Sequence, residues 1–325
     1  MVWSHISGCN FPFLPYNLTA CAQFVATAPH ALENPWWSVA EQEKAKRDIP
    51  VVHSSGGAEK IGLTTPRSHK GFVIGYVGTL TWFKLHHDIV DFCAAIKLPE
   101  ARFVFVGDPV EREDILSQAA KSGISEVLEF AGYAENVEET FSGFDVFGYP
   151  LNPYQSGTTE NALLEAMAAG LCPVCLRQNP EKNIIRHKET GLLVDTVEEY
   201  GEAMRYLYDH PEERRRMGIA ARADVLSRFS LAKTAADMEN VYNMLMRQPK
   251  KKYNFADTLG TTPVDWFLTC LSPEDRTPFL TNTEDSIRSS RGVLWEPSKS
   301  SIPQFSRYFS DDKILNYWVQ QRGIK

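Results

Sequence analysis

The sequence has 325 residues, of which 43% are hydrophobic, 11% aromatic and 23% charged. This composition excludes a disordered chain, and six cysteines are too few for a disulfide scaffold. The formal charge of −7, from 34 basic and 41 acidic residues, argues against sequence-independent binding to nucleic acid. No apolar run approaches the roughly 20 residues of a membrane span, and the N-terminus lacks the pattern of a signal peptide. We therefore expect a cytoplasmic protein of about two domains.

The first part of the chain, residues 1–70, is broken into short pieces by six prolines. The apolar runs at 24–26 and 49–52 are typical of strands. This part is too short and too interrupted to bury a sizeable core alone.

The middle of the chain, residues 71–247, alternates buried-strand patterns with helical patterns. This alternation predicts βαβ units and a Rossmann-like parallel sheet flanked by helices, an α/β fold. Ligands of such sheets bind at the carboxyl ends of the strands, so the loops after Gly78, Gly107, Gly132 and Pro150 are expected to line the site. Strands are predicted at 71–77, 101–106, 127–130, 145–149, 173–176 and 191–194, and helices at 84–96, 110–121, 135–141, 159–169, 197–209, 211–227 and 230–247.

The last part, residues 248–325, opens with the linker-like sequence 249–252 and is then rich in aromatic residues. That density argues against disorder. We expect this C-terminal extension to pack on the main body or on a partner.

The most informative stretch runs from the strand ending at Pro150 into the helix predicted at 159–169. Gly157 lets the backbone approach a ligand closely, and Thr159 is a suitable N-cap. The free N–H groups of a helix start favour an anion such as a diphosphate. Asn161 and Glu165 share one helix face, where a carboxylate can accept hydrogen bonds from a diol such as that of a ribose. The alternative is a solvated glutamate on an ordinary helix.

A second candidate is the turn after the first strand of the middle region. Backbone amides at Gly78 and Thr79, followed by Lys84 at the start of the predicted helix, suit a phosphate group. The motif is neither a P-loop nor G-x-G-x-x-G, so Lys84 as an ordinary surface lysine is the competing interpretation.

No metal site is expected. Cys172 and Cys175 have the spacing of a redox or zinc motif, but no second pair accompanies them, and we interpret them as core cysteines. The adjacent pairs His86-His87 and Asp311-Asp312 lack further ligands.

Four stretches in the middle region, taken together, resemble a known family. They are GYVGTLTWFK, FVFVGDPVEREDIL, LEFAGYAENVEETFSGFDVFGYP and ALLEAMAAGLCPVC, the last followed by ETGLLV. In order and spacing they resemble the C-terminal, nucleotide-sugar-binding domain of GT-B glycosyltransferases of the family 4-like type, the glycosyl transferases group 1. The resemblance covers about half the chain.

The resemblance implies roles for several residues in binding the donor. Glu165 matches the glutamate that holds the ribose hydroxyls, and Lys84 matches the lysine that meets the diphosphate. Gly132 and Tyr133 match the loop that approaches the base, and Gly107 belongs to the strand-Gly-Asp stretch.

Two positions depart from the family pattern. Thr79 stands where the family has an arginine, and Gly157 stands where it has its first acidic residue, near the donor sugar. Glu160, or the amides of Gly157, Thr158 and Thr159, is expected to substitute for that acid.

The function implied is transfer of a sugar from a nucleotide-diphosphate sugar to an unknown acceptor, with no metal and no cofactor. Lys84 and Glu160 are the expected catalytic residues. By this resemblance, residues 1–70 are expected to be the remnant of the family's N-terminal, acceptor-side domain. Either a partner chain or a further copy is expected to complete that domain, or the sequence is a truncated form. The alternative is a non-catalytic donor-binding subunit of a split enzyme. A generic nucleotide-sugar enzyme such as an epimerase is disfavoured by the missing G-x-G-x-x-G and Tyr-x-x-x-Lys motifs.

Overall fold

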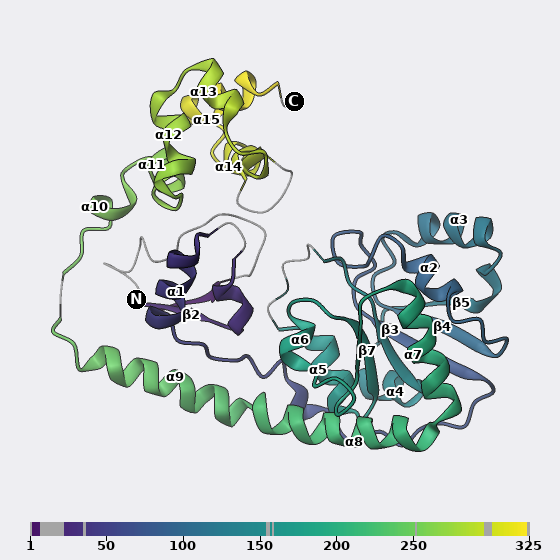
Figure 1. Cartoon of the computed structure of the whole chain (residues 1–325). Helices are drawn as coiled ribbons and strands as arrows, with labels where there is room; N and C mark the ends of the chain where they lie inside the picture. The colour runs from purple at the N-terminus through teal and green to yellow at the C-terminus, as the bar shows by residue number, and fades with distance from the viewer. Residues whose placement is uncertain are drawn as a thin grey trace. The chain divides into compact units, whose positions relative to one another are not determined.

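The computed structural model describes residues 2–6, 23–34, 37–153, 157, 159–250, 252–295 and 301–323. The chain divides into two compact units (Figure 1). One comprises residues 52–240, and the other joins residues 1–51 to residues 241–325. The N-terminal and C-terminal segments, which we expected as separate parts, thus belong to one unit.

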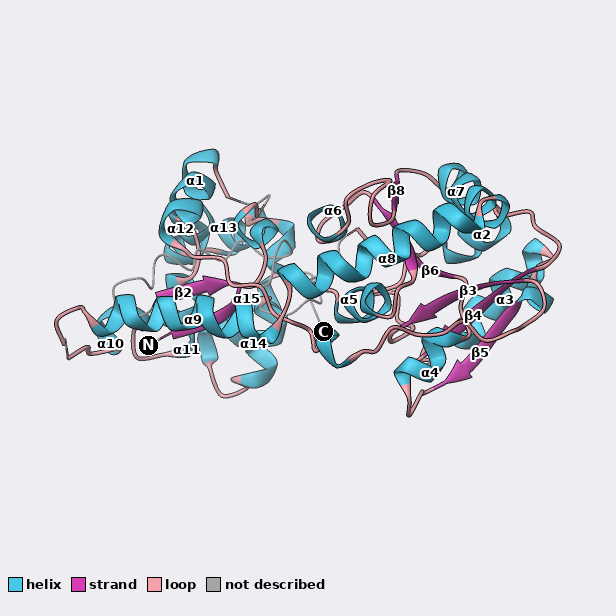
Figure 2. Ribbon diagram, turned by 90° about the horizontal axis from the view of Figure 1, so that it is seen from below, coloured by secondary structure: helices cyan, strands magenta, loops and turns pink. Residues whose placement is uncertain are grey.

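The 52–240 unit contains a parallel six-stranded sheet in the order β5-β4-β3-β6-β7-β8, with helices on either side (Figure 2). This arrangement confirms the predicted α/β fold. The strands are β3 (Phe72–Val77), β4 (Ala101–Val106), β5 (Leu128–Gly132), β6 (Val146–Tyr149), β7 (Cys172–Leu176) and β8 (Leu192–Val194).

The order of the strands reverses between β3 and β6. From β3 the chain builds outward through β4 and β5, and it then returns to place β6 on the other side of β3, where Ile74 pairs with Val146. The switch in strand order thus falls between β3 and β6, and open α/β sheets bind ligands at the carboxyl ends of the strands at such a point.

The helices of this unit follow the strands in turn. They are α2 (Ile89–Ala94), α3 (Arg112–Ser122), α4 (Val137–Ser142), α5 (Asn161–Ala168), α6 (Glu181–Ile184), α7 (Val197–Asp209) and α8 (Pro211–Arg228), with short 3-10 turns η3 (Ala58–Lys60) and η4 (Ser125–Val127). Gly123 ends α3 in the left-handed conformation at φ 70°, as a C-terminal glycine is expected to do.

The helix predicted at 84–96 is wrong in its first turn. The structure has α2 only from Ile89, and Lys84 lies in a turn five residues earlier. The reason is competition for the backbone: His86 N–H donates to the carbonyl of Pro150, and Asp88 N–H donates to His86 Nδ1. These groups are therefore unavailable for a continuous helix.

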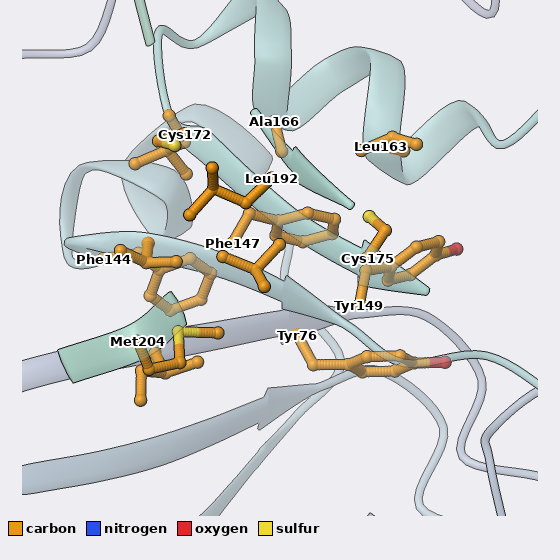
Figure 3. Packing of buried hydrophobic residues seen from close by; sticks show 14 of the residues in the cluster. Tyr76, Phe144, Phe147, Tyr149, Leu163, Ala166, Cys172, Cys175, Leu192 and Met204 are labelled. Atoms are coloured by element: carbon orange, nitrogen blue, oxygen red, sulfur yellow. The ribbon is translucent and has the colours of Figure 1, made fainter. Parts of the chain in front are cut away.

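The core of the unit contains a row of aromatic side chains across the central strands (Figure 3). The Tyr149 ring stacks on Tyr76 on one side and on Phe147 on the other, with centroids 5.3 and 5.0 Å apart. Figure 3 shows the hydroxyl groups of Tyr76 and Tyr149 pointing to the same side. Cys172 and Cys175 of β7 are buried with free thiols, which confirms their interpretation as core residues.

The edge strand β8 has side chains bound to its main chain. Leu193 N–H donates to His187 Nδ1 at 3.0 Å, and the Leu193 carbonyl accepts a hydrogen bond from Arg177 Nη2 at 3.0 Å. Both main-chain groups of this residue are thus paired although β8 has a neighbouring strand on one side only.

The second unit has two parts of different character. The N-terminal segment forms a parallel pair of β1 (Val2–Ile6) and β2 (Gln23–Ala26), with η2 (Pro29–Leu32) and α1 (Val39–Asp48). Of the strand expected at 49–52, only Val51 bridges to Ala26. The long helix α9 (Leu231–Met246) connects the 52–240 unit to the C-terminal segment, which is helical. The helices of this segment are α10 (Ala256–Leu259), α11 (Pro263–Thr269), α12 (Pro273–Thr281), α13 (Glu284–Ser289), η5 (Gly292–Trp295), α14 (Ile302–Tyr308) and α15 (Lys313–Gln321).

The aromatic residues of the C-terminal segment form a hydrophobic cluster of their own. Phe267, Phe279, Trp295 and Trp318 are its largest buried members. The structure thus gives these side chains a core within their own unit. Among the helices that the structure describes, none is both long and apolar enough to cross a bilayer.

Candidate active site

The loops after β3 and β6 are joined along their main chains. Asn152 N–H donates to the Lys84 carbonyl at 2.8 Å, and Asn152 Nδ2 donates to the Trp82 carbonyl at 2.9 Å. Leu85 and Leu151 form an antiparallel bridge beside them. These contacts hold the backbone of Lys84 against the chain that leaves β6, at the point where the strand order reverses.

This arrangement brings Lys84 onto Glu160, the residue directly before α5. Lys84 Nζ lies 3.0 Å from Glu160 Oε2, and Tyr149 OH donates to the same oxygen at 2.9 Å. The Glu160 side chain is only 2% exposed, whereas Lys84 is 31% exposed. A buried carboxylate needs such partners because its desolvation is costly.

The Lys84 ammonium retains capacity for a further ligand. It carries three N–H donors, and among the described residues only the Glu160 carboxylate accepts from it. The ammonium also lies 5.6 Å from the centroid of the Tyr149 ring. Lys84 can therefore bind an anion on its open side while it stays paired with Glu160.

The two tyrosines beneath this pair keep their protons. Burial raises the pKa of Tyr149 well above its ordinary value, and the negative charge of Glu160 raises it further. Burial followed by the same charge also raises the pKa of Tyr76, whose hydroxyl donates to the Thr79 carbonyl at 3.3 Å. Both hydroxyls are thus hydrogen-bond donors throughout the neutral range.

Helix α5 presents Asn161 and Glu165 one turn apart. Glu165 is half-buried, and burial raises the pKa of its carboxyl group. It forms no hydrogen bond or ion pair with any described residue, so its carboxylate is open to a ligand. Asn161 lies against the turn at Gly56, where an added Cβ would be 2.9 Å from Asn161 Oδ1.

The expected N-cap of this helix is wrong. Glu160, not Thr159, occupies the cap position, and it makes no side-chain bond to the helix because its carboxylate turns toward Lys84. Thr159 Oγ1 is buried and has no hydrogen-bond partner among the residues that the structure describes. Gly157 is partly buried. Thr158, also expected at the site, lies outside the described residues.

The glycines at the ends of β3, β4 and β5 bring their loops together. Gly107 N–H donates to the Gly132 carbonyl at 2.7 Å, and Gly78 N–H donates to the Val106 carbonyl at 2.9 Å. Gly107 has φ 137°, and a Cβ added there would lie 2.1 Å from the Gly78 carbonyl oxygen. Only glycine allows this approach. Tyr133, directly after Gly132, is 85% exposed.

Sequence reasoning missed Tyr149 and Glu181. Tyr149 is the last residue of β6, and its position at the carboxyl end of a strand could have marked it as a candidate site residue. Glu181 begins α6 and resembles an ordinary first-turn acid, yet it is fully buried. Within the described part of the chain, no group of three or more histidine, cysteine, aspartate or glutamate side chains is arranged to hold a metal ion.

Comparison with known proteins identifies the class. Residues 64–224 match the family model of the glycosyl transferases group 1, and the chain belongs to this family. The structure is similar to a glycosyltransferase from Rickettsia africae, with a TM-score of 0.61 at 15% identity over 76% of this chain and 71% of that one. It is also similar to HepE of Anabaena, solved in complex with UDP, with a TM-score of 0.55 at 15% identity over 70% of this chain and 64% of that one. These likenesses place the sheet and its helices in the GT-B fold.

Two curated relatives are similar in sequence. The sulfoquinovosyl transferase of Arabidopsis thaliana is 28% identical over 66% of this chain and 41% of its own length. The N-acetyl-alpha-D-glucosaminyl L-malate synthase of Bacillus anthracis is 27% identical over 70% of this chain and 61% of its own. The match thus spans roughly half the length of these relatives.

Proposed function

We propose that this chain binds a nucleotide-diphosphate sugar at the carboxyl ends of β3 and β6 and transfers the sugar to an acceptor. The observation that carries the proposal is the meeting of Lys84 with Glu160 where the strand order reverses, directly before α5. Family membership supports it, and so does the similarity to a protein solved with UDP.

In this proposal the donor lies along the carboxyl edge of the sheet. The first-turn amides of α5 and the open N–H groups of Lys84 bind the diphosphate. Glu165 accepts hydrogen bonds from the ribose hydroxyls, and the exposed ring of Tyr133 lies beside the base. The residues at the ends of β3, β4 and β5 form the wall of the proposed donor site; they are Gly78, Thr79, Gly107 and Gly132.

The chemical step requires stabilisation of the leaving diphosphate. The bond from the anomeric carbon to the diphosphate oxygen breaks, a bond to the acceptor hydroxyl oxygen forms, and the hydroxyl proton is released. Negative charge grows on the diphosphate as its bond breaks, and Lys84 and the α5 amides lie where they can stabilise it. Glu160 and Tyr149 hold the ammonium in place. On this basis we propose a metal-independent reaction.

A second candidate is a donor-binding chain without transferase activity. It is favoured by two observations: Glu160 already neutralises the charge of Lys84, and Gly157 replaces the acidic residue of the family pattern. In either case we propose that a partner chain or a further copy contributes the acceptor side.

The test measures binding and turnover separately. UDP, GDP and ADP are added to the purified chain, and thermal unfolding is followed; a nucleotide at 100 times its Kd is expected to add about 2.7 kcal/mol. Nucleotide-sugar hydrolysis and transfer to a panel of acceptors are then assayed. Binding with turnover supports the transferase, and binding without turnover supports the second candidate. Failure of all three nucleotides to stabilise the chain contradicts both.

A further inference from the structure

A recess lies at the outer edge of the sheet in the 52–240 unit, beside β8 and α7 (Figure 2). It has a volume of about 640 Å³ and is bounded by β8, by one face of α7 and by the first turns of α8. Small-molecule sites have volumes of about 300–1,000 Å³. None of the residues that line the recess is among those proposed to bind the donor. The recess is therefore a separate candidate for a ligand.

The edge of β8 at this recess is closed to a further strand. Leu193 N–H donates to His187 Nδ1, and the Leu193 carbonyl accepts from Arg177 Nη2, each at 3.0 Å. Both side chains also line the recess. A peptide that extended the sheet would have to displace them. A ligand of the recess must therefore be recognised by side chains and not by the main chain of β8.

Most of the charged side chains of the recess are already engaged. Arg177 Nε lies 3.1 Å from Asp195 Oδ2, and Arg216 Nη2 lies 2.8 Å from Glu213 Oε2. The Glu199 carboxylate accepts the Asp195 N–H at 2.7 Å at the start of α7, where the helix dipole favours a negative charge. These contacts leave no surplus of positive charge for a nucleotide or another polyanion.

Two charged groups of opposite sign are left over. Lys188 and Glu202 line the recess, and neither side chain forms an ion pair or a hydrogen bond with any residue that the structure describes. His187 lies next to Lys188 in the chain. Burial lowers the pKa of His187, and the charges of Arg177 and Lys188 lower it further, so the ring is neutral at neutral pH. Because its Nδ1 accepts the Leu193 N–H, the ring carries its proton on Nε2, which is a hydrogen-bond donor.

An apolar floor separates these donors from acceptors on α7. Glu202 and Tyr206 lie one turn apart on the face of α7 that lines the recess. The floor consists of the buried residues Leu192, Ala203 and Met217. The recess thus combines an ammonium group and an imidazole N–H, an apolar surface, and a carboxylate with a phenol hydroxyl.

We propose that this recess binds a small zwitterion with an apolar body, of the class of a dipeptide of apolar amino acids. The carboxylate of the ligand is bound by Lys188 and His187 Nε2. Its ammonium group is bound by Glu202 and the Tyr206 hydroxyl, and its side chains pack on the apolar floor. One charge of each sign matches the two unpaired groups and adds no net charge to the recess. The inference does not rest on the proposed function, because it uses no residue of the donor site.

The experiment is calorimetric titration of the full chain with three dipeptides, leucyl-leucine, phenylalanyl-leucine and valyl-leucine. Each is compared with its N-acetyl form, which lacks the ammonium group, and with its C-terminal amide, which lacks the carboxylate. At least one free dipeptide is expected to bind with a Kd of about 1 mM or lower, and both blocked forms about tenfold more weakly.

Variants assign each end of the ligand. Glu202→Gln is expected to weaken binding of the free dipeptide about tenfold and to leave the N-acetyl form unchanged. Lys188→Gln is expected to have the same effect on the free dipeptide and to leave the amide form unchanged. Glu198→Gln, which removes an exposed carboxylate of α7 outside the recess, is expected to behave like the wild-type chain.

Three results would overturn the proposal. They are failure of all three dipeptides to bind at about 10 mM, equal affinities of the free and blocked forms, and wild-type affinity in both Glu202→Gln and Lys188→Gln. Both replaced side chains are exposed, so neither substitution is expected to disturb the fold, and thermal unfolding of the variants checks this.

Discussion

The ammonium of Lys84 has two tasks that can be separated by mutation. It compensates the buried carboxylate of Glu160, which is 2% exposed, and its remaining N–H groups are free to bind an anion. The first task is expected to affect folding, and the second, which rests on the proposed function, is expected to affect catalysis. Replacing Lys84 alone is expected to change both stability and turnover, whereas replacing Lys84 and Glu160 together distinguishes the two effects.

We predict that Lys84→Ala lowers kcat by about 10²–10³-fold and changes the Kd for UDP by less than about tenfold, because the charge on the leaving diphosphate is largest in the transition state. The same variant should lose about 1–3 kcal/mol of stability, since Glu160 keeps only Tyr149 as a partner. Lys84→Ala with Glu160→Gln should recover the stability and not the turnover. Steady-state kinetics and urea unfolding check this; a Lys84→Ala enzyme with wild-type turnover would show that the lysine has no catalytic role.

The buried acid Glu181 makes stability depend on pH. Its pKa is raised in the folded chain, so the folded state holds a proton that the unfolded state releases above about pH 4.5. This contribution is complete below that pH and is lost as pH rises toward the folded-state pKa. Relative to wild type, Glu181→Gln should therefore become more stable with rising pH, by up to about 1.4 kcal/mol per unit. Urea unfolding of both chains from about pH 5 to about pH 8 measures the difference; a constant difference contradicts the prediction.

Residue patterns could identify only some members of the site. Lys84, Glu160 and Glu165 stand in motifs whose spacing is visible in the sequence, and the structure brings the first two into contact. Tyr149 and Glu181 carry no such signal, because their importance comes from burial beside residues that are distant along the chain. The functional roles of Lys84, Glu160, Glu165 and Tyr149 remain predictions.

At the scale of elements, the glycines after the central strands bring three loops into main-chain contact. Gly107→Ala should cost more than about 2 kcal/mol and weaken UDP binding, because its Cβ would meet the Gly78 carbonyl at 2.1 Å and φ is 137°. Gly123→Ala is the matched control, since φ is 70° but no atom of the described residues lies within 4 Å of the added Cβ; it should cost about 1 kcal/mol. Thermal unfolding and UDP titration compare the two variants. Equal losses of stability and of UDP affinity would show that the close approach of Gly107 to the Gly78 carbonyl is not what requires glycine there.

Long periodic elements were predictable, and short connections were not. The helices expected at 197–209, 211–227 and 230–247 agree with α7, α8 and α9 to within one residue at each end, because apolar spacing repeats over several turns. The segment 84–88 was predicted as helix, yet hydrogen bonds from Asn152 and to Pro150, more than sixty residues away, determine its conformation. Local patterns carry no information about such partners.

For the whole molecule, the two units have separate cores, and we expect them to respond separately to mutation and ligand. Trp318 is 1% exposed and its Nε1 donates to Asn282 Oδ1 at 2.8 Å, so Trp318→Ala should cost the unit that contains it about 3–5 kcal/mol. Tyr308→Ala, at a side chain that is 77% exposed, should change stability by less than about 0.5 kcal/mol.

Differential scanning calorimetry checks this prediction. Trp318→Ala should lower the temperature of one unfolding transition only. UDP should raise the temperature of the other transition, which belongs to the 52–240 unit. A single transition that shifts with both changes would show that the two units unfold together.

The outer edge of β8 has a further consequence for the behaviour of the chain at high concentration. Because His187 and Arg177 already engage the amide and carbonyl of Leu193, an incoming strand from another molecule would have to displace two side chains before it could extend the sheet. We therefore expect the same two residues to oppose fibril growth from this end. The resistance should be lost when both are replaced by alanine, even though neither is among the residues proposed to bind the donor.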